Sequence, residues 1–343
     1  MNGLLTALIT VLVFMFIILV HEFGHFIAAK AMGVTVHEFS IGFGPVILKK
    51  QGKSTLYCLR LFPIGGFVKL EGEDESSDDP GALNNKKAWK RLIVMAAGAV
   101  FNLILGLIVF VGIYMNTAEF PTLKIGEIID EAKGTATVEI LQPGDEIVSF
   151  NGKRMYYYKD LSFVISMESD GSPINLTIKR NGEYKDVTVN PVYSNGRYLI
   201  GFRPMYEQVG FFGAIKYGII ETFFTMRLVL YSLGMLITGK VGIADMSGPV
   251  GASTVIGQAA SAGVLSLFNI FALLSVNVGL FNLIPFPALD GGRIFFLLIE
   301  MVRRKPIPPE KEGMVHFVGL ILLLILMLFV TSSDIYKLFL PKG

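Results

Sequence analysis

The segment LVHEFGHFIAAK, residues 19–30, places two histidines and a glutamate at the end of a long apolar run. His21 and His25 are four positions apart, so on a helix they lie one turn apart on the same face, with Glu22 beside them. In the pattern H-E-x-x-H, the two imidazoles bind Zn²⁺ and the glutamate takes a proton from water. Titratable side chains inside a membrane span are costly, and a bound metal gives a reason for their presence. The spacing therefore predicts a zinc site with Glu22 as the general base.

A catalytic zinc usually has three protein ligands and one open position, so a third ligand is expected. The chain has one cysteine, Cys58, which excludes intrachain disulfides and C-x-x-C metal motifs. Asp290 is the best candidate, because it lies in the late apolar segment NVGLFNLIPFPALDGGRIFFLLIE. Pro287 and the pair Gly291-Gly292 are expected to break the helix there and to direct the carboxylate sideways. The alternative is that Asp290 only caps a helix end.

The elements that must position these residues are those of a membrane protein. Of the 343 residues, 52% are hydrophobic and only 17% are charged, and the mean hydropathy is +0.58. The net charge of +2 is close to neutral, and the basic residues lie in loops, which argues against a nucleic-acid partner. Four segments are long and apolar enough to cross a bilayer: residues 4–29, 92–115, 263–284 and 314–330.

The first apolar run lacks basic residues before it and a small-residue cleavage site after it, so we expect a retained span rather than a removed signal peptide. Another apolar segment, residues 210–240, is interrupted by Lys216, Glu221 and Arg227. We predict a helix that lies at the membrane interface or packs on the spans. A fifth crossing is the alternative.

Basic residues also predict the orientation of the chain. They are dense between the first two spans, and Arg303, Arg304 and Lys305 lie between the last two. By the positive-inside rule, both loops face the cytoplasm. Both termini and the long central segment then face outward.

Residues 36–70 form a loop that is too apolar for the cytosol, with two β-type segments joined at Gln51-Gly52. Irregular backbone survives at membrane depth only where it is buried in protein or lines a water-filled cavity. We therefore predict a β-hairpin that dips into the membrane against the helices. Its edge would offer hydrogen bonds to the backbone of an unwound substrate. The acidic stretch EGEDESSDDPG that follows is expected to be solvated.

Residues 117–203 are predicted to form one small, outward-facing β-rich domain. Strand-like runs are LKIGEII, DEIVSF, INLTIKR, KDVTVN and YLIGF. Turns are expected at Asn151-Gly152, Asn181-Gly182 and Asn195-Gly196.

H-E-F-G-H in the first span, together with N-x-x-P-x-P-A-L-D-G-G in a late one, resembles the site-2 protease family of intramembrane zinc metalloproteases. The segments FSIGFGP, PIGGFVKL and LITGKVGIADMSGPVGA also resemble this family, so the likeness covers nearly the whole chain. The single soluble island is similar to that of the bacterial regulator-of-sigma-factor type (RseP/RasP-like).

The resemblance implies roles for individual residues. His21, His25 and Asp290 would be the zinc ligands, and Glu22 would be the catalytic base. Asn277 and Asn282, in SVNVGLFN, match family positions that handle substrate or stabilise the reaction. Considered alone, either asparagine is equally well explained as an interhelical hydrogen-bonding residue.

LQPGDEIVSFNGK, residues 141–153, is similar to the Pro-Gly-Asp and Asn-Gly turns of a bacterial PDZ domain. PDZ domains bind an extended peptide as an added strand. The usual run of small residues before the Pro-Gly-Asp turn is replaced by EAKGTATVEI. The domain is therefore expected either to bind a peptide ligand or to filter substrates by size.

The expected fold is a polytopic α-helical membrane protein of about four transmembrane helices, with a membrane-associated β-hairpin and one small β-rich PDZ domain. We predict four parts: residues 1–116 with the HExxH helix and the hairpin, 117–203 as the PDZ domain, 204–262 as a membrane-associated helix and a Gly/Ser-rich segment, and 263–343 as the C-terminal pair with the LDGG motif.

The implied activity is zinc-dependent cleavage of single-span membrane proteins within the bilayer, in regulated intramembrane proteolysis. Implied substrates are anti-sigma factors already trimmed by another protease, or remnant signal peptides. The implied location is the bacterial cytoplasmic membrane, with the PDZ domain outside.

Three other functions remain open at this level. A silent PDZ scaffold would hold a structural zinc with four ligands, for which only His37 and His316 are further histidines. A transporter with a mid-membrane site would show related halves, and no internal repeat is evident. Another HExxH membrane metalloprotease would supply a downstream glutamate as third ligand.

Overall fold

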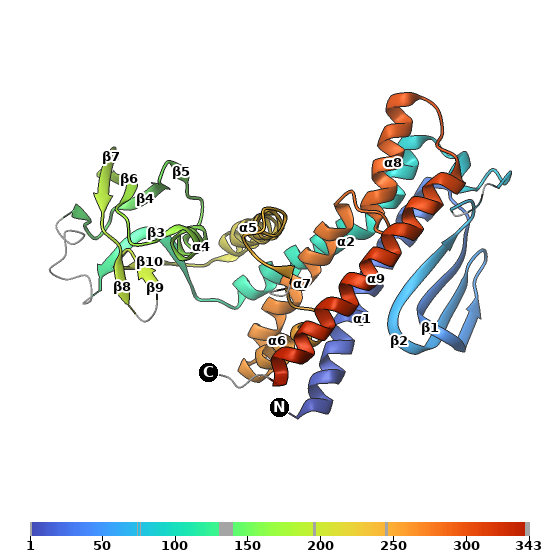
Figure 1. The fold of residues 1–343 in the computed structure, drawn as a ribbon, viewed down its shortest axis with the longest axis horizontal. Helices are drawn as coiled ribbons and strands as arrows, with labels where there is room; N and C mark the ends of the chain where they lie inside the picture. Colours follow the sequence, from blue (N-terminus) through green and yellow to red (C-terminus); the bar gives the residue numbers. More distant parts are fainter. Residues whose placement is uncertain are drawn as a thin grey trace. The chain divides into compact units, whose positions relative to one another are not determined.

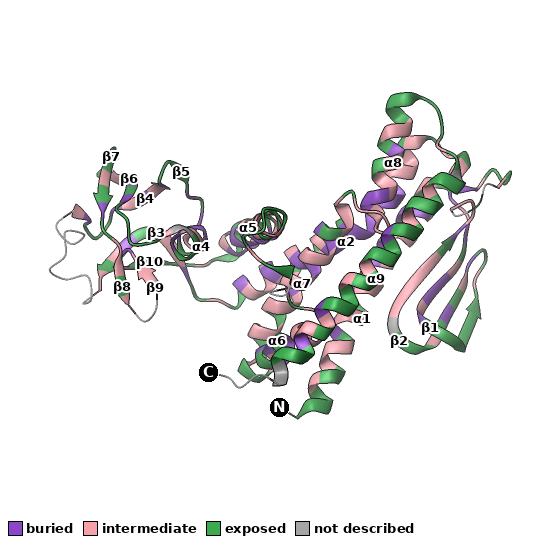
Figure 2. Cartoon of the chain, in the orientation of Figure 1, coloured by how far each residue is buried: buried purple, intermediate pink, exposed green. Residues whose placement is uncertain are grey.

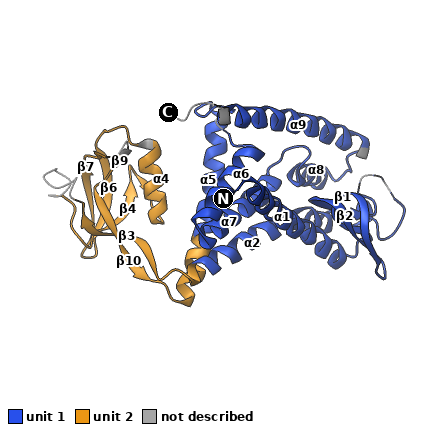
Figure 3. Ribbon diagram, turned by 90° about the horizontal axis from the view of Figure 1, so that it is seen from below, with its two compact units in different colours: residues 1–113, 221–343 blue, residues 114–220 orange. Residues whose placement is uncertain are grey.

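The computed structural model describes residues 2–73, 75, 77–129, 140–194, 197–243 and 246–339. The chain divides into two compact units (Figure 3): unit 1 comprises residues 1–113 and 221–343, and unit 2 comprises residues 114–220. Unit 1 holds long helices and a β-hairpin, and unit 2 holds a small sheet (Figure 1). The β-rich domain predicted at residues 117–203 falls within unit 2.

Long apolar helices dominate the chain. They are α1 (Gly3–Met32), α2 (Ala88–Met115), α5 (Phe211–Ile237), α6 (Pro249–Ala262), α7 (Val264–Leu283), α8 (Asp290–Arg303) and α9 (Pro309–Phe339), with a short 3-10 helix, η1 (Leu83–Asn85). Among the described helices, α1, α2, α5, α7 and α9 are long and apolar enough to cross a bilayer. The chain is therefore a multi-pass membrane protein.

The predicted count of four spans is not confirmed, because α5 meets the same criterion of length and composition. Its mean hydropathy over the most apolar stretch is 1.4, compared with 2.1 to 2.9 for the other four helices. The low value reflects Glu221 and Arg227, two charged residues that lie inside that stretch.

Caps at both ends define α1. The Asn2 side chain accepts a hydrogen bond from the Leu5 N–H, as an N-cap residue does. Gly33 has a left-handed φ of 74°, and its N–H donates to the carbonyls of Ala29 and Lys30. The helix is continuous between these caps, so the histidine spacing of four is preserved as one turn.

Small residues let α2 pack closely against α1 and α7. A Cβ added at Gly24 of α1 would come within 2.6 Å of the Ala97 carbonyl oxygen on α2. A Cβ added at Gly279 of α7 would come within 2.7 Å of the Ala99 carbonyl oxygen. Close backbone approach through glycine and alanine is typical of packed membrane helices. Much of α2 is buried accordingly (Figure 2).

The two β-type segments of the first loop form strands β1 (Val36–Gln51) and β2 (Leu56–Leu70), which pair with each other. Each strand also folds back on itself, which the sequence did not predict. The bends contain Gly42 and Gly44 in β1 and Gly65 in β2, with φ values of 84°, 85° and 88°. Glycine adopts this left-handed conformation without the strain that a Cβ would cause.

The folding back leaves two strand edges. Residues 39–41 pair on one side with residues 66–68 and on the other side with residues 57–59, so they are central. Residues 46–51 and 66–70 each pair on one side only within this sheet. These two segments are therefore its edges.

The end of the hairpin exposes a group of large apolar side chains: Phe43, Val46, Ile47, Leu48, Leu61 and Phe62. Its arginine, Arg60, is neutralised locally, donating hydrogen bonds to Glu38 Oε1 at 2.6 Å, Ser40 Oγ at 2.8 Å and the Gly44 carbonyl at 2.8 Å. An apolar patch with its one charge satisfied suits contact with lipid or with other apolar protein surface.

Unit 2 contains a sheet of order β10-β3-β4-β6-β7, with β5 paired to β4, and helix α4 packs against the core of this sheet. The elements are β3 (Glu119–Ile128), β4 (Glu146–Phe150), β5 (Lys153–Arg154), α4 (Tyr158–Glu168), β6 (Ile174–Arg180), β7 (Glu183–Val189), the hairpin β8 (Val192–Ser194) and β9 (Arg197–Leu199), and β10 (Phe202–Gln208). The predicted runs lie in these strands, except that YLIGF is divided between β9 and β10.

Two of the predicted turns have the backbone that Asn-Gly hairpins require. Asn151 and Gly152 have φ values of 46° and 77°, and Asn181 and Gly182 have values of 51° and 90°. The third predicted turn, Asn195-Gly196, lies outside the described residues, as do residues 131–139 of EAKGTATVEI.

Asp145, in the predicted Pro-Gly-Asp turn, is buried and accepts three hydrogen bonds. Arg180 donates from Nε and Nη2, each at 2.7 Å, and the Gln142 N–H donates at 2.8 Å. Burial by itself raises the pKa of the Asp145 carboxyl, but the hydrogen bonds and the Arg180 charge hold this pKa below its ordinary value. The pair fixes the turn to strand β6.

Candidate metal centre

Three side chains from distant parts of the sequence converge in unit 1. His21 Nε2 and His25 Nε2 are 3.2 Å apart, and Asp290 Oδ2 lies 3.1 Å from the first and 3.3 Å from the second. Both imidazoles are largely buried, and Asp290 is partly buried. The structure thus brings together the three ligands expected from the sequence.

The three atoms fit a zinc ion. Zn–N and Zn–O bonds of about 2.0–2.1 Å in a tetrahedron place neighbouring ligand atoms about 3.3 Å apart, close to the distances found here. Asp290 Oδ2 is buried and accepts no hydrogen bond from any described residue, which suits an oxygen that faces a cation. His25 Nδ1 lies 2.8 Å from the Val94 carbonyl oxygen, which can only accept, so Nδ1 carries the proton and Nε2 presents a lone pair.

The connection between α7 and α8 places Asp290. It leaves helical geometry after Leu283, and Asp290 is the first residue of α8. Ala288 has a φ of 78°, and its N–H donates to His316 Nδ1 at 3.0 Å, which ties the connection to α9. The N-cap of α8 is Leu289, with no side-chain cap hydrogen bond, so Asp290 is not the cap residue that the alternative predicted, and its Oδ2 faces the histidines.

The role expected for the double glycine is corrected. Gly291 and Gly292 do not break a helix, because they lie inside the first turn of α8. A Cβ at Gly291 would come within 2.7 Å of the Leu283 carbonyl carbon, and one at Gly292 within 2.6 Å of the Phe286 carbonyl oxygen. The two glycines allow α8 to pack onto the connection that precedes it, and so bring Asp290 close to α1.

Glu22 lies beside one edge of the β-sheet. A Cβ added at Gly66 would come within 3.4 Å of Glu22 Cγ and within 2.8 Å of the Ser40 carbonyl oxygen. Gly66 is the first residue of the edge at residues 66–70. The glutamate therefore lies next to the start of this edge strand.

The two predicted asparagines have different surroundings. Asn277 lines an apolar cavity of about 330 Å³ between α5 and α7, and its buried Oδ1 has no hydrogen-bond partner among the described residues. Asn282 Nδ2 donates to the Val278 carbonyl of its own helix at 3.0 Å. His37 binds Glu71 and is not part of the three-residue cluster.

Sequence reasoning missed the contribution of α2. Val94, Gly98 and Asn102 are spaced by four, so they share one face, and each contacts a histidine of α1. A Cβ at Gly98 would come within 2.7 Å of His25 Cδ2 and 2.8 Å of His21 Cε1. The spacing of these small and polar residues was the available signal.

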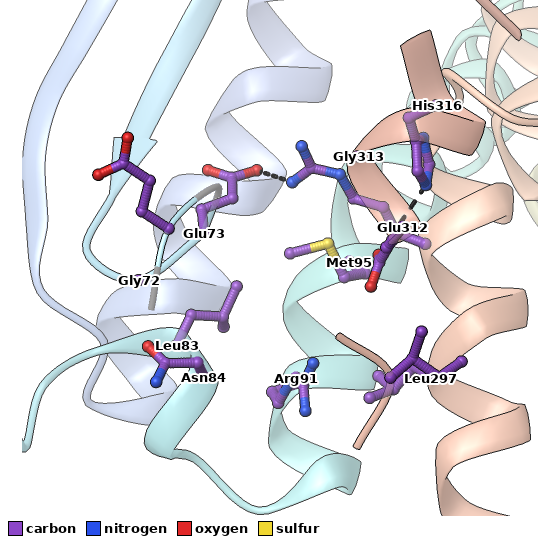
Figure 4. Close-up of a pocket in the computed structure, with 13 residues that line it drawn as sticks. Gly72, Glu73, Leu83, Asn84, Arg91, Met95, Leu297, Glu312, Gly313 and His316 are labelled. Atoms are coloured by element: carbon purple, nitrogen blue, oxygen red, sulfur yellow. Dashed lines mark hydrogen bonds and ion pairs between the residues drawn. The ribbon is translucent and has the colours of Figure 1, made fainter. Parts of the chain in front are cut away.

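A second missed feature is a polar cavity of about 270 Å³ next to α8 (Figure 4). Glu73, after β2, forms an ion pair with Arg293, three residues after Asp290. Arg91 of α2 also lines the cavity, and its Nη1 donates to both Glu300 oxygens at 2.8 and 3.0 Å. These pairs link α8 to the hairpin and to α2.

Residues 9–326 match the family model described as Peptidase family M50. A chain from Clostridium acetobutylicum is 41% identical over 331 residues, which cover 95% of this chain and 96% of that one. The zinc metalloprotease RasP of Geobacillus kaustophilus is 33% identical, with 96% and 97% covered. The regulator of sigma-W protease RasP of Bacillus subtilis is 29% identical, with 98% and 99% covered.

A solved PDZ domain of an SdrC-like protein from Listeria monocytogenes is similar to 24% of this chain, over 86% of its own length, at 14% identity and a TM-score of 0.22. The match to the family model and the full-length relatives confirm the resemblance found in the sequence motifs. The chain therefore belongs to peptidase family M50, the site-2 protease family, and it is a zinc metalloprotease.

Proposed function

We propose that the protein is an intramembrane endopeptidase that cleaves single-span membrane proteins at a zinc ion held by His21, His25 and Asp290. The observation that carries the proposal is the convergence of these three ligand atoms next to Glu22 and a strand edge. Zinc bound there would supply Lewis acidity to polarise a water molecule and the scissile carbonyl.

Glu22 is proposed to accept the proton of the attacking water and to return it to the leaving amine. Its position supports this role, because it neighbours the ligand His21 but is not one of the three clustered ligand groups. Within the described part of the chain, the cluster holds three such groups and no fourth. Three protein ligands leave a position open for water and substrate, which favours catalysis over the scaffold with a closed structural zinc.

Substrate presentation is proposed to use the edge at residues 66–70. A transmembrane helix hides its carbonyls in hydrogen bonds to its own backbone, so it must unwind before it is cut. An edge strand offers free backbone groups to an extended peptide. The contact between Gly66 and Glu22 supports this proposal, because a peptide paired with that edge would pass beside the catalytic base.

Water is proposed to enter through the polar cavity lined by Glu73, Arg293 and Glu312 (Figure 4). The cavity adjoins the helix that begins with Asp290. Its charged lining holds ordered water more readily than the apolar surface of the bundle.

The site is proposed to face the cytoplasmic side of the bacterial cytoplasmic membrane, because the loops rich in lysine and arginine flank it. Unit 2 would then lie outside. We propose that α5 lies along the outer interface. The lower hydropathy of α5 and the charges of Glu221 and Arg227 within it support this placement.

We propose anti-sigma factors already trimmed outside, or remnant signal peptides, as substrates in regulated intramembrane proteolysis. The name of the Bacillus subtilis relative, a regulator of sigma-W protease, supports the first class. Unit 2 is proposed to be a PDZ domain that binds a peptide or filters by size. Asn277 and Asn282 are proposed to bind substrate, and the unpaired buried Oδ1 of Asn277 supports this for the first of them.

The test is to co-express the full chain with a tagged single-span anti-sigma fragment truncated on its outer side. We expect a shortened product with the wild type and none with Glu22→Gln, because a general base contributes about 10²- to 10⁴-fold in rate. Glu127→Gln, an exposed carboxylate of unit 2, is the matched control and should cleave normally. Equal cleavage by Glu22→Gln would overturn the proposal.

A further inference from the structure

Asn102 is a fully buried polar residue next to the candidate metal centre. It lies on α2 with 0% of its surface exposed. Its Nδ2 is 3.4 Å from His21 Nδ1, and its Oδ1 has no hydrogen-bond partner among the described residues. The Ser275 hydroxyl of α7 donates to the Asn102 backbone carbonyl at 2.8 Å, so it does not contact the Asn102 side-chain amide.

The two histidines differ in what faces their Nδ1 atoms. His25 Nδ1 faces the Val94 carbonyl, which can only accept a hydrogen bond, so its protonation is settled by the backbone. His21 Nδ1 faces a side-chain amide, which can either donate or accept. The backbone thus prepares His25 for a metal, whereas His21 depends on the orientation of Asn102.

We propose that Asn102 is a positioning residue for zinc, and that it turns its amide so that Oδ1 accepts a hydrogen bond from His21 Nδ1–H. This inference rests on the proposed role of His21 as a zinc ligand through Nε2. A half-turn about the Cβ–Cγ bond exchanges Oδ1 and Nδ2, and it gives the buried Oδ1 the partner that it lacks. The neutral imidazole then presents its Nε2 lone pair to the metal.

The geometry of α2 supports the assignment. Val94, Gly98 and Asn102 recur every four residues, so they form one stripe facing α1. Gly98, in the middle, has no side chain to keep the imidazoles away from the helix. Both ends of the stripe supply an acceptor to a histidine Nδ1, one from the backbone and one from a side chain.

The test measures zinc affinity of the purified full chain by competition with a chelator, without any assay of proteolysis. Asn102→Leu has a similar size but no acceptor, and we expect a 10- to 100-fold loss of zinc affinity, as for other outer-shell partners of metal-binding histidines. Asn102→Asp keeps an acceptor at the same place and should bind zinc within about threefold of the wild type. Ser275→Ala, which removes a neighbouring hydrogen bond, is the matched control and should also bind normally.

A double-mutant cycle distinguishes an effect of Asn102 that acts through His21 from a general effect on the fold. Asn102→Leu should have no further effect on zinc affinity in a His21→Ala background, because the partner is already absent. The visible spectrum of the Co²⁺-substituted protein should shift in Asn102→Leu and remain unchanged in Asn102→Asp.

The proposal is overturned if Asn102→Leu binds zinc as the wild type does, if Asn102→Asp loses as much affinity as Asn102→Leu, or if the loss persists undiminished in the His21→Ala background. The proposed zinc site fails in a different way, since His21→Ala alone would then leave zinc affinity unchanged. Thermal unfolding of each variant identifies a folding defect, and the Co²⁺ spectrum of the folded fraction still decides the role of Asn102.

Discussion

Gly66 of strand β2 lies against Glu22 of α1, so closely that an added Cβ would come within 3.4 Å of the glutamate Cγ. The edge at residues 66–70 therefore passes next to the proposed catalytic base, whereas residues 46–51 form the opposite edge of the same sheet. This difference allows the role of the edge strand to be tested.

Proline in the edge beside Glu22 should slow cleavage. Adjacent residues of a strand point their N–H groups to opposite sides, so one of Val68→Pro and Lys69→Pro removes an outward N–H without breaking the sheet. A lost hydrogen bond to the substrate of about 0.5–1.5 kcal/mol lowers kcat/KM about 2- to 13-fold. Lys49→Pro and Lys50→Pro, on the other edge, are the controls. In each pair, the variant that keeps the wild-type Tm is the one to compare. Equal cleavage rates for the proline variants of the two edges would contradict the proposal.

Asp290→Ala should lose zinc and proteolysis together. Two histidines alone hold the metal much more weakly than three ligands, so we expect a loss of affinity beyond the 10- to 100-fold typical of outer-shell partners. Metal content by atomic emission and cleavage in the co-expression assay measure the two effects. Glu300→Gln, on the same helix but paired with Arg91, should keep the metal. Full zinc occupancy in Asp290→Ala would contradict the ligand assignment.

Gly98→Ala should disturb the site although it adds only one methyl group. The new Cβ would come within 2.8 Å of His21 Cε1, and overpacking of this kind costs about 1–3 kcal/mol. Zinc affinity and Tm should both fall. Gly112→Ala, on the same helix, meets nothing within 4 Å, so it should leave both unchanged or raise Tm slightly. Identical behaviour of the two variants would show that α2 does not press on the histidines.

Unit 2 should become less stable at low pH, because the Asp145 carboxylate is protonated there. Its pKa is held below the ordinary value in the folded state, so this stabilisation is fully present above the unfolded pKa of about 3.9 and is lost as pH falls through the folded pKa. We expect amide exchange of β4 and β6 in the full chain, corrected for intrinsic rates, to rise below about pH 4. Asp145→Asn should abolish this dependence.

The ion pair between Asp145 and Arg180 should stabilise unit 2 more than an exposed ion pair of the same length does. Arg180→Gln leaves the buried Asp145 charge unpaired, which costs about 3–5 kcal/mol for a fully buried pair and less here, since Arg180 is partly exposed. Arg203→Gln removes a pair with Glu127 that is also 2.7 Å long but mostly exposed, worth at most about 1 kcal/mol. Amide exchange of unit 2 in the two variants measures the difference, and equal effects would contradict the argument from burial.

The residue-level prediction of the metal ligands depended on local and non-local information in different ways. The spacing of His21 and His25 is enough to place both on one helical face, because α-helix geometry is set within a single turn. Asp290 is far away in the sequence, and its approach requires the α7–α8 connection and the glycines that pack it. The motif indicated Asp290 as the candidate ligand, but its distance from the histidines could not be deduced.

In the hairpin, too, the sequence predicted the local structure but not the non-local contacts. Alternating apolar residues and Gly-rich punctuation predicted two β segments at residues 36–70, and both are present. Their folding back, which makes residues 66–70 an edge beside Glu22, depends on which backbone groups pair across the sheet. Strand pairing is non-local, so composition and periodicity do not specify it.

The sequence by itself determined the chemistry of this protein, because metal-ligand type, helical spacing and long apolar runs are properties of short segments. Only the tertiary structure decided what surrounds that chemistry: the Val94 carbonyl and the Asn102 amide behind the histidines, and the strand edge beside Glu22. These neighbours come from other elements, and their positions follow from close packing and from pairing buried polar groups across the whole fold.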